Sequence, residues 1–374
     1  MLIEFRCSNH KSIRDEILFS MLAGTDSAHG EQILPARDLR LLHTAVIYGA
    51  NGSGKSNLLD ALEQLRAWVL GMRPLRQTSH KLAVDTPSRY TVQFLWENVR
   101  YVFTCALLGE TVTEETLLAF PGGRRTTVYT RTPEGLRVCS RFRDELTHAH
   151  LSPSALLAAT AAPIPPIAAL RSFFGECLVP YHLAQPGERM KDALNLLRRD
   201  RIKSAVLALL NTLGTGIVDL RVTGPEDAPR GETVYDGFST DLLEEESSGI
   251  RRMIEFLCPL VDMLCAHRVL LCDEPEANLH ELLLPRLIRG IRQVIPESRS
   301  QLIFSTHSTG LLDLALFRKD QIWFTELRSE DRSTELYSLA EIRDVRPNEN
   351  IRLGYLAGEY GAVPVCREGG NGRG

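Results

Sequence analysis

The sequence has no CxxC pair and no close cluster of cysteines. This absence excludes a zinc knuckle and gives no support to a disulfide framework. The eight cysteines are scattered along the chain, at positions 7, 105, 139, 177, 258, 265, 272 and 366. We therefore expect reduced thiols in a cytoplasmic protein.

Long apolar runs, heptads and an excess of one charge are also missing. No apolar run approaches the roughly 18 residues of a membrane span, and charges interrupt Met1–Cys7 too early for a signal peptide. No heptad pattern persists, which argues against a long coiled coil. The formal net charge is −4, so the chain has no overall positive charge that would attract nucleic acid. A local basic patch remains as the alternative.

The order of apolar patterns predicts an α/β fold. Strand patterns at 2–7 and 45–48 precede a helical pattern at 57–70, and consecutive strands over 89–139 indicate an antiparallel sheet. After residue 247 the patterns alternate between helix and strand, which is typical of a parallel sheet. We expect an N-terminal lobe at 1–140, a helical lobe at 141–215, a C-terminal lobe at 216–364 and a disordered tail at 365–374. Within the helical lobe, helices are expected at 153–161, 166–176 and 190–213.

The segment Gly49–Ser56 fits the phosphate-loop pattern G-x-x-x-x-G-K-[ST] in full. Its glycines let backbone N–H groups turn toward phosphate oxygens, Lys55 adds positive charge at the β- and γ-phosphates, and Ser56 offers a hydroxyl to Mg²⁺. A strand before it and a helix after it supply the required context; the alternative is a structural glycine-rich turn. The residues expected to contact ATP are Asn51, Gly52, Ser53, Gly54, Lys55, Ser56 and Asn57.

Two adjacent carboxylates follow the apolar strand predicted at 269–272. Asp273 is placed to hold Mg²⁺ directly or through water, and Glu274 to orient or deprotonate the attacking water. The alternative is a strand that ends in solvated acids, which is common in α/β proteins. The phosphate loop upstream favours the functional interpretation.

A polar cluster with one histidine, Ser305–Ser308, follows another apolar strand. Ligands of doubly wound sheets bind outside the carboxyl ends of the strands, so His307 is expected near the γ-phosphate. A purely structural histidine is the alternative.

Glu246–Ile250 opens an amphipathic helix, for which Ser247 or Ser248 is a natural N-cap. A helix N-terminus that contains Gly249 is also an anion site, and both interpretations can hold together. The phosphate loop of this chain already covers one side of a nucleotide. We therefore expect Ser247 and Gly249 to contact a nucleotide held by another subunit.

Together these elements resemble the ABC-type ATPase superfamily of SMC, RecF and OLD proteins. The matches are the Walker A loop at Gly49–Ser56, the Walker B strand at Leu270–Glu274, a D-loop position at Glu276–His280, a switch histidine in Ser305–Ser308, a shortened signature motif at Ser247–Gly249 and a similar opening at Asn9–Ser12. The phrases Asp320–Phe324, Glu335–Leu339 and Gly358–Pro364 resemble a narrower group. That group comprises the small stand-alone bacterial ATPases of the RloA/AbiLii type, in the same family as the ATPase subunits of Septu-like systems.

The resemblance implies an ABC-ATPase-like P-loop fold with an antiparallel β subdomain and a helical lobe. It also implies ATP and Mg²⁺ as cofactors and an ATP-dependent head-to-head dimer, in which Ser247 and Gly249 of one subunit complete the Walker site of the other. Such proteins commonly accompany a separate nuclease or Toprim-like effector in anti-phage defence. Gln93 is a candidate for the Q-loop, but an ordinary strand residue is the preferred interpretation.

Three functions compete. The first is an ATP-driven switch whose state is read by a separate effector. The second is a RecF- or SMC-like DNA repair ATPase that binds DNA directly, for which the basic run Arg198–Lys203 offers phosphate contacts or merely a solvated helix face. The third, a self-contained OLD-type nuclease, is disfavoured because no acidic Toprim cluster follows His307.

Overall fold

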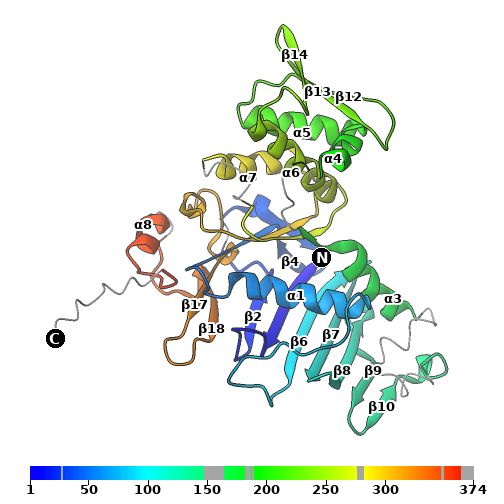
Figure 1. The fold of residues 1–374 in the computed structure, drawn as a ribbon. Coiled ribbons are helices and arrows are strands. Elements are labelled where there is room, and N and C mark those ends of the chain that lie inside the picture. Colours follow the sequence, from blue (N-terminus) through cyan, green and yellow to red (C-terminus); the bar gives the residue numbers. More distant parts are fainter. Residues whose placement is uncertain are drawn as a thin grey trace, which may run out of the picture.

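The computed structural model describes residues 1–26, 28–146, 164–181, 187, 189–275, 282–346 and 349–363. The predicted helix at 153–161, the D-loop segment Glu276–His280 and the predicted tail at 365–374 lie outside the described residues. Figure 1 shows a central sheet with a layer of helices on one side and a large antiparallel sheet with helix α1 on the other.

The central sheet has six strands in the order β11-β15-β16-β5-β17-β18. All neighbours are parallel except β17 and β18. Every residue of β5, β15 and β16 is buried, as expected for a sheet covered on both faces. The predicted α/β fold with a parallel sheet is confirmed. The strands are β5 (Thr44–Gly49), β11 (Leu178–Tyr181), β15 (Val269–Cys272), β16 (Gln301–Ser305), β17 (Ile322–Leu327) and β18 (Thr334–Ser338).

The second sheet is antiparallel and has seven strands in the order β10-β9-β8-β7-β6-β1-β2. Glu97 and Asn98 both have positive φ and form the two-residue turn between β6 and β7, a turn that suits the twist of a hairpin. The predicted antiparallel sheet is also confirmed. Its strands are β1 (Leu2–Ser8), β2 (Ile17–Ser20), β6 (Ser88–Trp96), β7 (Val99–Leu108), β8 (Thr111–Phe120), β9 (Thr126–Thr132) and β10 (Gly135–Val138).

Strand β5 separates two hydrophobic cores by its alternating side chains. Ala45 and Ile47 belong to a core shared with α1 (Lys55–Val69) and the antiparallel sheet. Val46 and Tyr48 belong to a second core with the helices of the opposite layer. The phosphate loop follows directly from this doubly buried strand, so its starting point is fixed by packing on both faces.

The helical layer contains four helices that pack on one another: α4 (Met190–Leu197), α5 (Asp200–Thr212), α6 (Ser248–Cys265) and α7 (Leu283–Val294). A three-stranded sheet lies beside them (Figure 1), made of β12 (Asp219–Thr223), β13 (Arg230–Tyr235) and β14 (Phe238–Asp241). The other described strands and α-helices are β3 (Ile33–Ala36), β4 (Leu39–Leu42), α3 (Pro165–Ser172) and α8 (Ile351–Leu356), and a π-helical turn lies at Phe173–Cys177.

The range expected to be a helical lobe, 141–215, differs from that expectation in part. It contains β11, an edge strand of the central sheet, paired with β15. The helix predicted at 190–213 is divided into α4 and α5, which pack with α6 and α7 from the later part of the chain. A four-residue strand that contains Pro180 has too short a pattern to be recognised, and proline suits an edge position.

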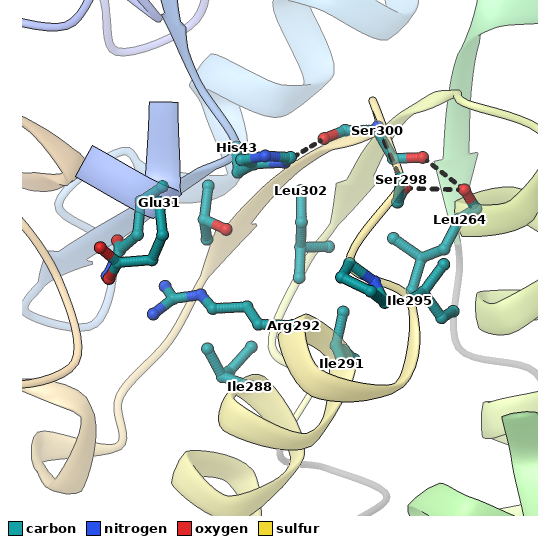
Figure 2. A pocket seen from close by; sticks show the side chains of 13 residues that line it. Glu31, His43, Leu264, Ile288, Ile291, Arg292, Ile295, Ser298, Ser300 and Leu302 are labelled. Carbon is teal, nitrogen blue, oxygen red and sulfur yellow. Dashed lines mark hydrogen bonds between the residues drawn. The ribbon is translucent and has the colours of Figure 1, made fainter. Parts of the chain in front are cut away.

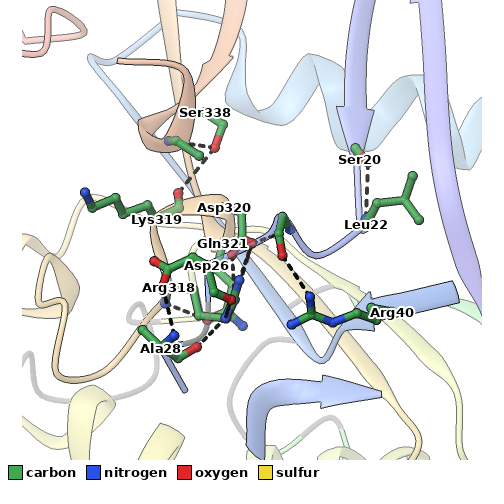
Figure 3. Close-up of polar contacts among 12 residues, drawn as sticks. Ser20, Leu22, Asp26, Ala28, Arg40, Arg318, Lys319, Asp320, Gln321 and Ser338 are labelled. Carbon is green, nitrogen blue, oxygen red and sulfur yellow. Dashed lines mark hydrogen bonds and ion pairs between the residues drawn. The ribbon is translucent and has the colours of Figure 1, made fainter. Parts of the chain in front are cut away.

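A buried arginine fastens the N-terminal segment to the central sheet (Figure 3). Arg318 is 1% exposed and pairs with Asp320 at 2.8 Å. Its guanidinium also donates to the carbonyl oxygens of Asp26, at 3.0 Å, and Ala28. Asp320 in turn accepts from the backbone N–H of Gly24 at 2.8 Å. These contacts hold Gly24, Asp26 and Ala28 against the start of β17, the strand beside β5.

Among the described residues, no helix combines the length and the apolar character that crossing a membrane requires.

Candidate functional site

The predicted phosphate loop connects β5 to α1, as the pattern requires. Gly54 is the N-cap of α1 with φ of 110°, and the helix begins at Lys55. Asn51, Gly52 and Ser56 are exposed, whereas Ser53 is 2% exposed. The loop therefore presents the N-terminus of a buried helix, where free N–H groups and the helix dipole favour an anion.

Gly54 is fixed by its backbone and by its neighbour Thr334 on β18. An added Cβ would lie 2.1 Å from the Thr334 Oγ1 atom. That hydroxyl donates to the carbonyl oxygen of Ser53 at 2.8 Å. The Ser53 hydroxyl lies 2.6 Å from that of Thr325 on β17. Thr325 of β17 and Thr334 of β18 thus pack against the phosphate loop, and only a glycine at position 54 leaves room for Thr334.

The opening motif Asn9–Ser12 lies against the phosphate loop, which the sequence did not reveal. Ser12 Oγ accepts from the Asn57 amide at 2.6 Å and lies 2.7 Å from the Thr334 hydroxyl. One residue earlier, Lys11 pairs with Asp60 of α1 at 2.7 Å. Asn57 is consequently occupied with Ser12 and supports the first turn of α1. Only long-range packing brings these segments together, so no spacing in the sequence announces the contact.

Lys55 is 4% exposed and folds over its own loop. Its ammonium donates to the carbonyl oxygens of Gly49 at 2.9 Å and Ala50 at 3.2 Å. A buried ammonium near free N–H groups concentrates positive charge where phosphate oxygens would lie. This placement agrees with the predicted phosphate contact.

Asp273, Glu274 and His307 come together at the carboxyl ends of β15 and β16, as expected for neighbouring parallel strands. Ser305 Oγ donates to Asp273 Oδ1 and accepts from the backbone N–H of Glu274 at 3.1 Å. His307 Nε2 donates to Glu274 Oε1 at 2.9 Å. Glu274 has φ of 48°, a conformation that non-glycine residues rarely adopt, and such strain is often kept at functional sites.

One cavity joins the two halves of this site. Ser56 and Asn57 from α1 and Asp273 from the end of β15 line it, together with Lys11 and Tyr181. The side chains of Glu274 and His307 are 44% and 37% exposed at the same edge of the sheet. The arrangement provides hydroxyl and carboxylate oxygens beside an anion-binding loop, which are the ligands that Mg²⁺ prefers.

The predicted signature residues, Ser247 and Gly249, lie at the N-terminus of α6. Ser247 is the N-cap, and its side chain accepts from the backbone N–H of Ile250 at 3.2 Å. This confirms the capping interpretation. Ser247 and Gly249 are both exposed. In the part of the chain that the structure describes, no hydrogen bond joins either residue to the phosphate loop of the same chain.

Glu246 holds the start of α6 in place, a role that sequence reasoning missed. Its carboxylate accepts from Thr233 at 2.5 Å and from Tyr235 at 2.8 Å, both on β13, and from Thr240 on β14 at 3.1 Å. It also accepts from the Ser247 N–H at 2.7 Å. Burial raises the pKa of Glu246, but these hydrogen bonds outweigh burial, so the pKa is below its ordinary value. Glu246 therefore anchors the start of α6 to β13 and β14 of the three-stranded sheet.

Two other predicted features have structural explanations. Gln93 lies inside β6, paired with Glu4 and Val102, so the strand interpretation is confirmed. In the basic run Arg198–Lys203, Arg199 pairs with Asp262 at 2.9 Å and Lys203 with Asp219 at 2.7 Å. The charges of Arg199 and Lys203 are thus balanced within the protein.

Replacing Gly54 by alanine should destabilise the loop more than the same change at Gly52. Both glycines have positive φ, at a cost of about 1–2 kcal/mol for alanine, but only the Cβ at position 54 meets Thr334. We expect Gly52→Ala to lower the free energy of unfolding by about 1 kcal/mol and Gly54→Ala by about 3 kcal/mol or more. Urea denaturation of the two variants measures the difference, and equal losses would contradict the steric role of Thr334.

The sequence matches the family model AAA_21, described as "AAA domain, putative AbiEii toxin, Type IV TA system", over residues 45–145 and 170–313. The matched ranges contain the phosphate loop, the signature residues, Asp273, Glu274 and His307. No curated protein matches the chain.

Three Smc head structures are among the solved structures to which the chain is similar. One is an Smc head bound to the C-terminal winged-helix domain of ScpA, with 17% identity, coverage of 90% of this chain and 97% of that chain, and a TM-score of 0.48. Another is an SMC head domain from Thermotoga maritima, with 12% identity, coverage of 90% and 98%, and a TM-score of 0.48. The third is an Smc head from Pyrococcus furiosus bound to the C-terminal domain of ScpA, with 16% identity, coverage of 90% and 96%, and a TM-score of 0.45.

Proposed function

This chain belongs to the AAA_21 family of AAA domains, and from that premise we propose that it is the ATP-binding and ATP-hydrolysing subunit of a dimeric switch. The observation that carries the proposal is the meeting of a phosphate loop with Asp273, Glu274 and His307 at one edge of the parallel sheet. Phosphate binding and a polarising acid–histidine pair are together what hydrolysis of a phosphoanhydride needs.

ATP would bind with its phosphates on the loop. The N–H groups of Asn51, Gly52, Ser53 and Gly54 and of the first turn of α1 would donate hydrogen bonds to the phosphate oxygens. Lys55, which donates to the carbonyl oxygens of Gly49 and Ala50 in this structure, would instead donate to the β- and γ-phosphates. Buried positive charge gives each of these hydrogen bonds extra strength.

Ser56 and Asp273 would hold Mg²⁺. They line one cavity and offer only oxygen ligands, and Mg²⁺ commonly takes one or two protein ligands besides phosphate and water. No cluster of three metal-binding side chains is found within the described ranges, which agrees with such a shared site. When bound, Mg²⁺ would neutralise charge on the phosphates.

Glu274 is the proposed base and His307 its partner. The carboxylate of Glu274 is positioned to orient a water molecule and accept its proton as the oxygen attacks the γ-phosphate. The 2.9 Å hydrogen bond from His307 fixes that carboxylate, and His307 reaches the same exposed edge, where it would contact the γ-phosphate. The Ser305 hydroxyl hydrogen-bonds both the Asp273 carboxylate and the Glu274 backbone N–H, which fixes the positions of the two acidic residues relative to each other.

The site is incomplete in one chain, which is why we propose a dimer. Ser247 and Gly249 form an exposed helix N-terminus with no loop contact among the described residues. A second subunit that binds head to head would bring this N-terminus to the γ-phosphate of the first. ATP would then close the dimer because both subunits contact it, and hydrolysis would open it.

Replacing Ser247 by arginine should abolish ATP-driven dimerisation and leave ATP binding to the monomer unchanged. The long cationic side chain would fill the space of the partner's γ-phosphate and break the cap of α6, at about 1 kcal/mol. Sedimentation velocity with a non-hydrolysable ATP analogue measures the dimer, and a fluorescent nucleotide measures binding. Ser204→Arg, on the exposed face of α5, is the matched control. Normal pairing of Ser247→Arg would refute the proposed contact.

We further propose that the switch controls a separately encoded nuclease or Toprim-like effector in a bacterial defence system. The support for a role in defence is the family description, which names a putative toxin of a type IV toxin–antitoxin system. A neighbouring reading frame for such an effector, and its co-purification with this chain in an ATP-dependent manner, are the expected results. Neighbouring recombination genes and no effector would favour the DNA repair alternative, for which the internally paired Arg199 and Lys203 give no support.

A further inference from the structure

The Ser305 hydroxyl lies at the carboxyl end of β16 and is completely buried, with an exposure of 0%. It donates to Asp273 Oδ1 and accepts from the Glu274 backbone N–H at 3.1 Å. An ionised carboxylate only accepts hydrogen bonds and a backbone N–H only donates them, so the direction of both bonds is fixed. A hydroxyl held from two sides cannot turn, and it therefore fixes the rotation of the Asp273 carboxylate.

The second oxygen of this carboxylate, Asp273 Oδ2, is the one left for a cation. Within the described residues it accepts no hydrogen bond, and it is not among the buried polar atoms that lack a partner. It is therefore accessible. Asp273 lines the same cavity as Ser56, the other proposed Mg²⁺ ligand. While its bond to Ser305 is intact, the carboxylate cannot turn to offer both oxygens to a cation in this cavity.

Two further carboxylates line the cavity, those of Asp60 and Glu63 on α1. Asp60 Oδ2 accepts from His10 Nε2 at 2.8 Å and pairs with the Lys11 ammonium at 2.7 Å, so its charge is already balanced. Glu63 lies about 10 Å further along the axis of α1 than Ser56. Among the residues described around this cavity, Asp273 is thus the anionic ligand available beside Ser56.

The number and the freedom of ligand oxygens distinguish Mg²⁺ from Ca²⁺. Mg²⁺ requires octahedral coordination, keeps several waters and is commonly held by few carboxylates together with substrate phosphates. Ca²⁺ takes about six to eight oxygens and readily binds a carboxylate through both of its oxygens. A carboxylate that offers one oxygen in a fixed direction suits Mg²⁺, whereas a carboxylate that can rotate also suits Ca²⁺.

We propose that Ser305 makes the nucleotide site selective for Mg²⁺ over Ca²⁺, because it holds Asp273 so that the carboxylate binds through one oxygen. Ser305 is a positioning residue in this role, since it acts through Asp273 and is not itself a ligand. The inference rests on the proposed function, because the cation binds together with ATP. It adds to that function by assigning the choice of cation to one buried hydroxyl.

Cation titrations of Ser305→Ala test the proposal without hydrolysis, so the contact of Ser305 with Glu274 does not affect the result. The full chain is mixed with a fluorescent non-hydrolysable ATP analogue, and the affinity of the complex for Mg²⁺ and for Ca²⁺ is measured from the fluorescence. Loss of a group that orients a metal ligand typically costs about 10–100-fold in metal affinity. Ser305→Ala should therefore weaken Mg²⁺ binding by about tenfold or more and Ca²⁺ binding by less. Ser305→Thr keeps the hydroxyl and should keep the wild-type ratio of the two affinities.

Ser300→Ala is the matched control, because Ser300 is also buried and directly precedes the other end of β16. Its hydroxyl donates to the carbonyl oxygen of Leu264 at 2.8 Å (Figure 2). Ser300 does not line the cavity of Asp273 and Ser56, so the ratio of the Mg²⁺ and Ca²⁺ affinities should equal that of the wild type. An equal fall of this ratio in Ser300→Ala and Ser305→Ala would overturn the specific role of Ser305.

The outcomes distinguish this inference from the proposed function. If the wild type fails to bind the analogue with either cation, the proposed function is contradicted and the inference is overturned with it. If the wild type and a folded Ser305→Ala bind the analogue with the same ratio of Mg²⁺ to Ca²⁺ affinity, only the role of Ser305 is overturned.

A crystal structure of the wild type with the analogue and Mn²⁺ decides if Ser305→Ala does not fold. Contact between the cation and Oδ2 alone, directly or through water, with the Ser305 bond intact would support the proposal. Chelation of the cation by both oxygens of Asp273 would overturn it.

Discussion

Replacing Glu274 by glutamine should reduce ATP hydrolysis by about 10²–10⁴-fold and leave ATP binding intact. Glutamine keeps the size of the side chain and can still accept from His307, whose Nε2 lies 2.9 Å from the carboxylate in the wild type. It cannot accept a proton from water. Since hydrolysis opens the proposed dimer, the variant should accumulate as an ATP-bound dimer. Phosphate release and size-exclusion chromatography with light scattering measure the two effects.

The matched control for this variant is Glu134→Gln, at an exposed turn between β9 and β10. It makes the same chemical change far from Ser305 and His307 along the chain and should hydrolyse ATP normally. Hydrolysis by Glu274→Gln at the wild-type rate would show that Glu274 is not the base. If hydrolysis is lost but no stable dimer forms, the role of Glu274 as the base is supported and the hypothesis of an ATP-gated dimer is contradicted.

Replacing Lys55 by alanine should weaken ATP binding by about 100-fold or more, because the ammonium is the proposed charged contact to the β- and γ-phosphates. The change also removes the hydrogen bonds to Gly49 and Ala50 that arrange the loop. Ser53 keeps its contacts to Thr325 and Thr334, so the loop should remain folded. Titration with a fluorescent ATP analogue measures the affinity.

Lys191→Ala is the control for Lys55→Ala, because it removes an exposed ammonium from α4. Its affinity for ATP should equal that of the wild type. The melting temperature of Lys55→Ala in the absence of nucleotide shows whether the loop and α1 remain folded. Tight ATP binding by a folded Lys55→Ala variant would reject the phosphate-loop assignment.

How far the sequence predicted the site depended on the range of the interactions. Gly49–Ser56 is readable because strand, loop and helix are consecutive, and the structure has the same order at β5 and α1. Asp273 and His307 are readable as strand-end residues, since parallel strands end at one edge. The contact between Ser12, Asn57 and Thr334 was not readable, because each residue is polar and ordinary in its own segment.

The same limit applies to β11 and to Glu246. β11 has four residues, and its place at the sheet edge comes from pairing with β15, which is distant in sequence. Glu246 reads as one of several acids before a helix, and only the fold of β13 and β14 surrounds it with three hydroxyl groups. Neither has a local period or motif to indicate it.

The sequence by itself determined that this chain has a phosphate loop on an α/β fold, because local periodicity and consecutive residues suffice for both. The tertiary structure alone decided what surrounds that loop. It placed Thr334 against Gly54 and Ser305 between Asp273 and Glu274. Such contacts join residues whose separation in the chain has no period, so they exist only once both hydrophobic cores have packed around β5.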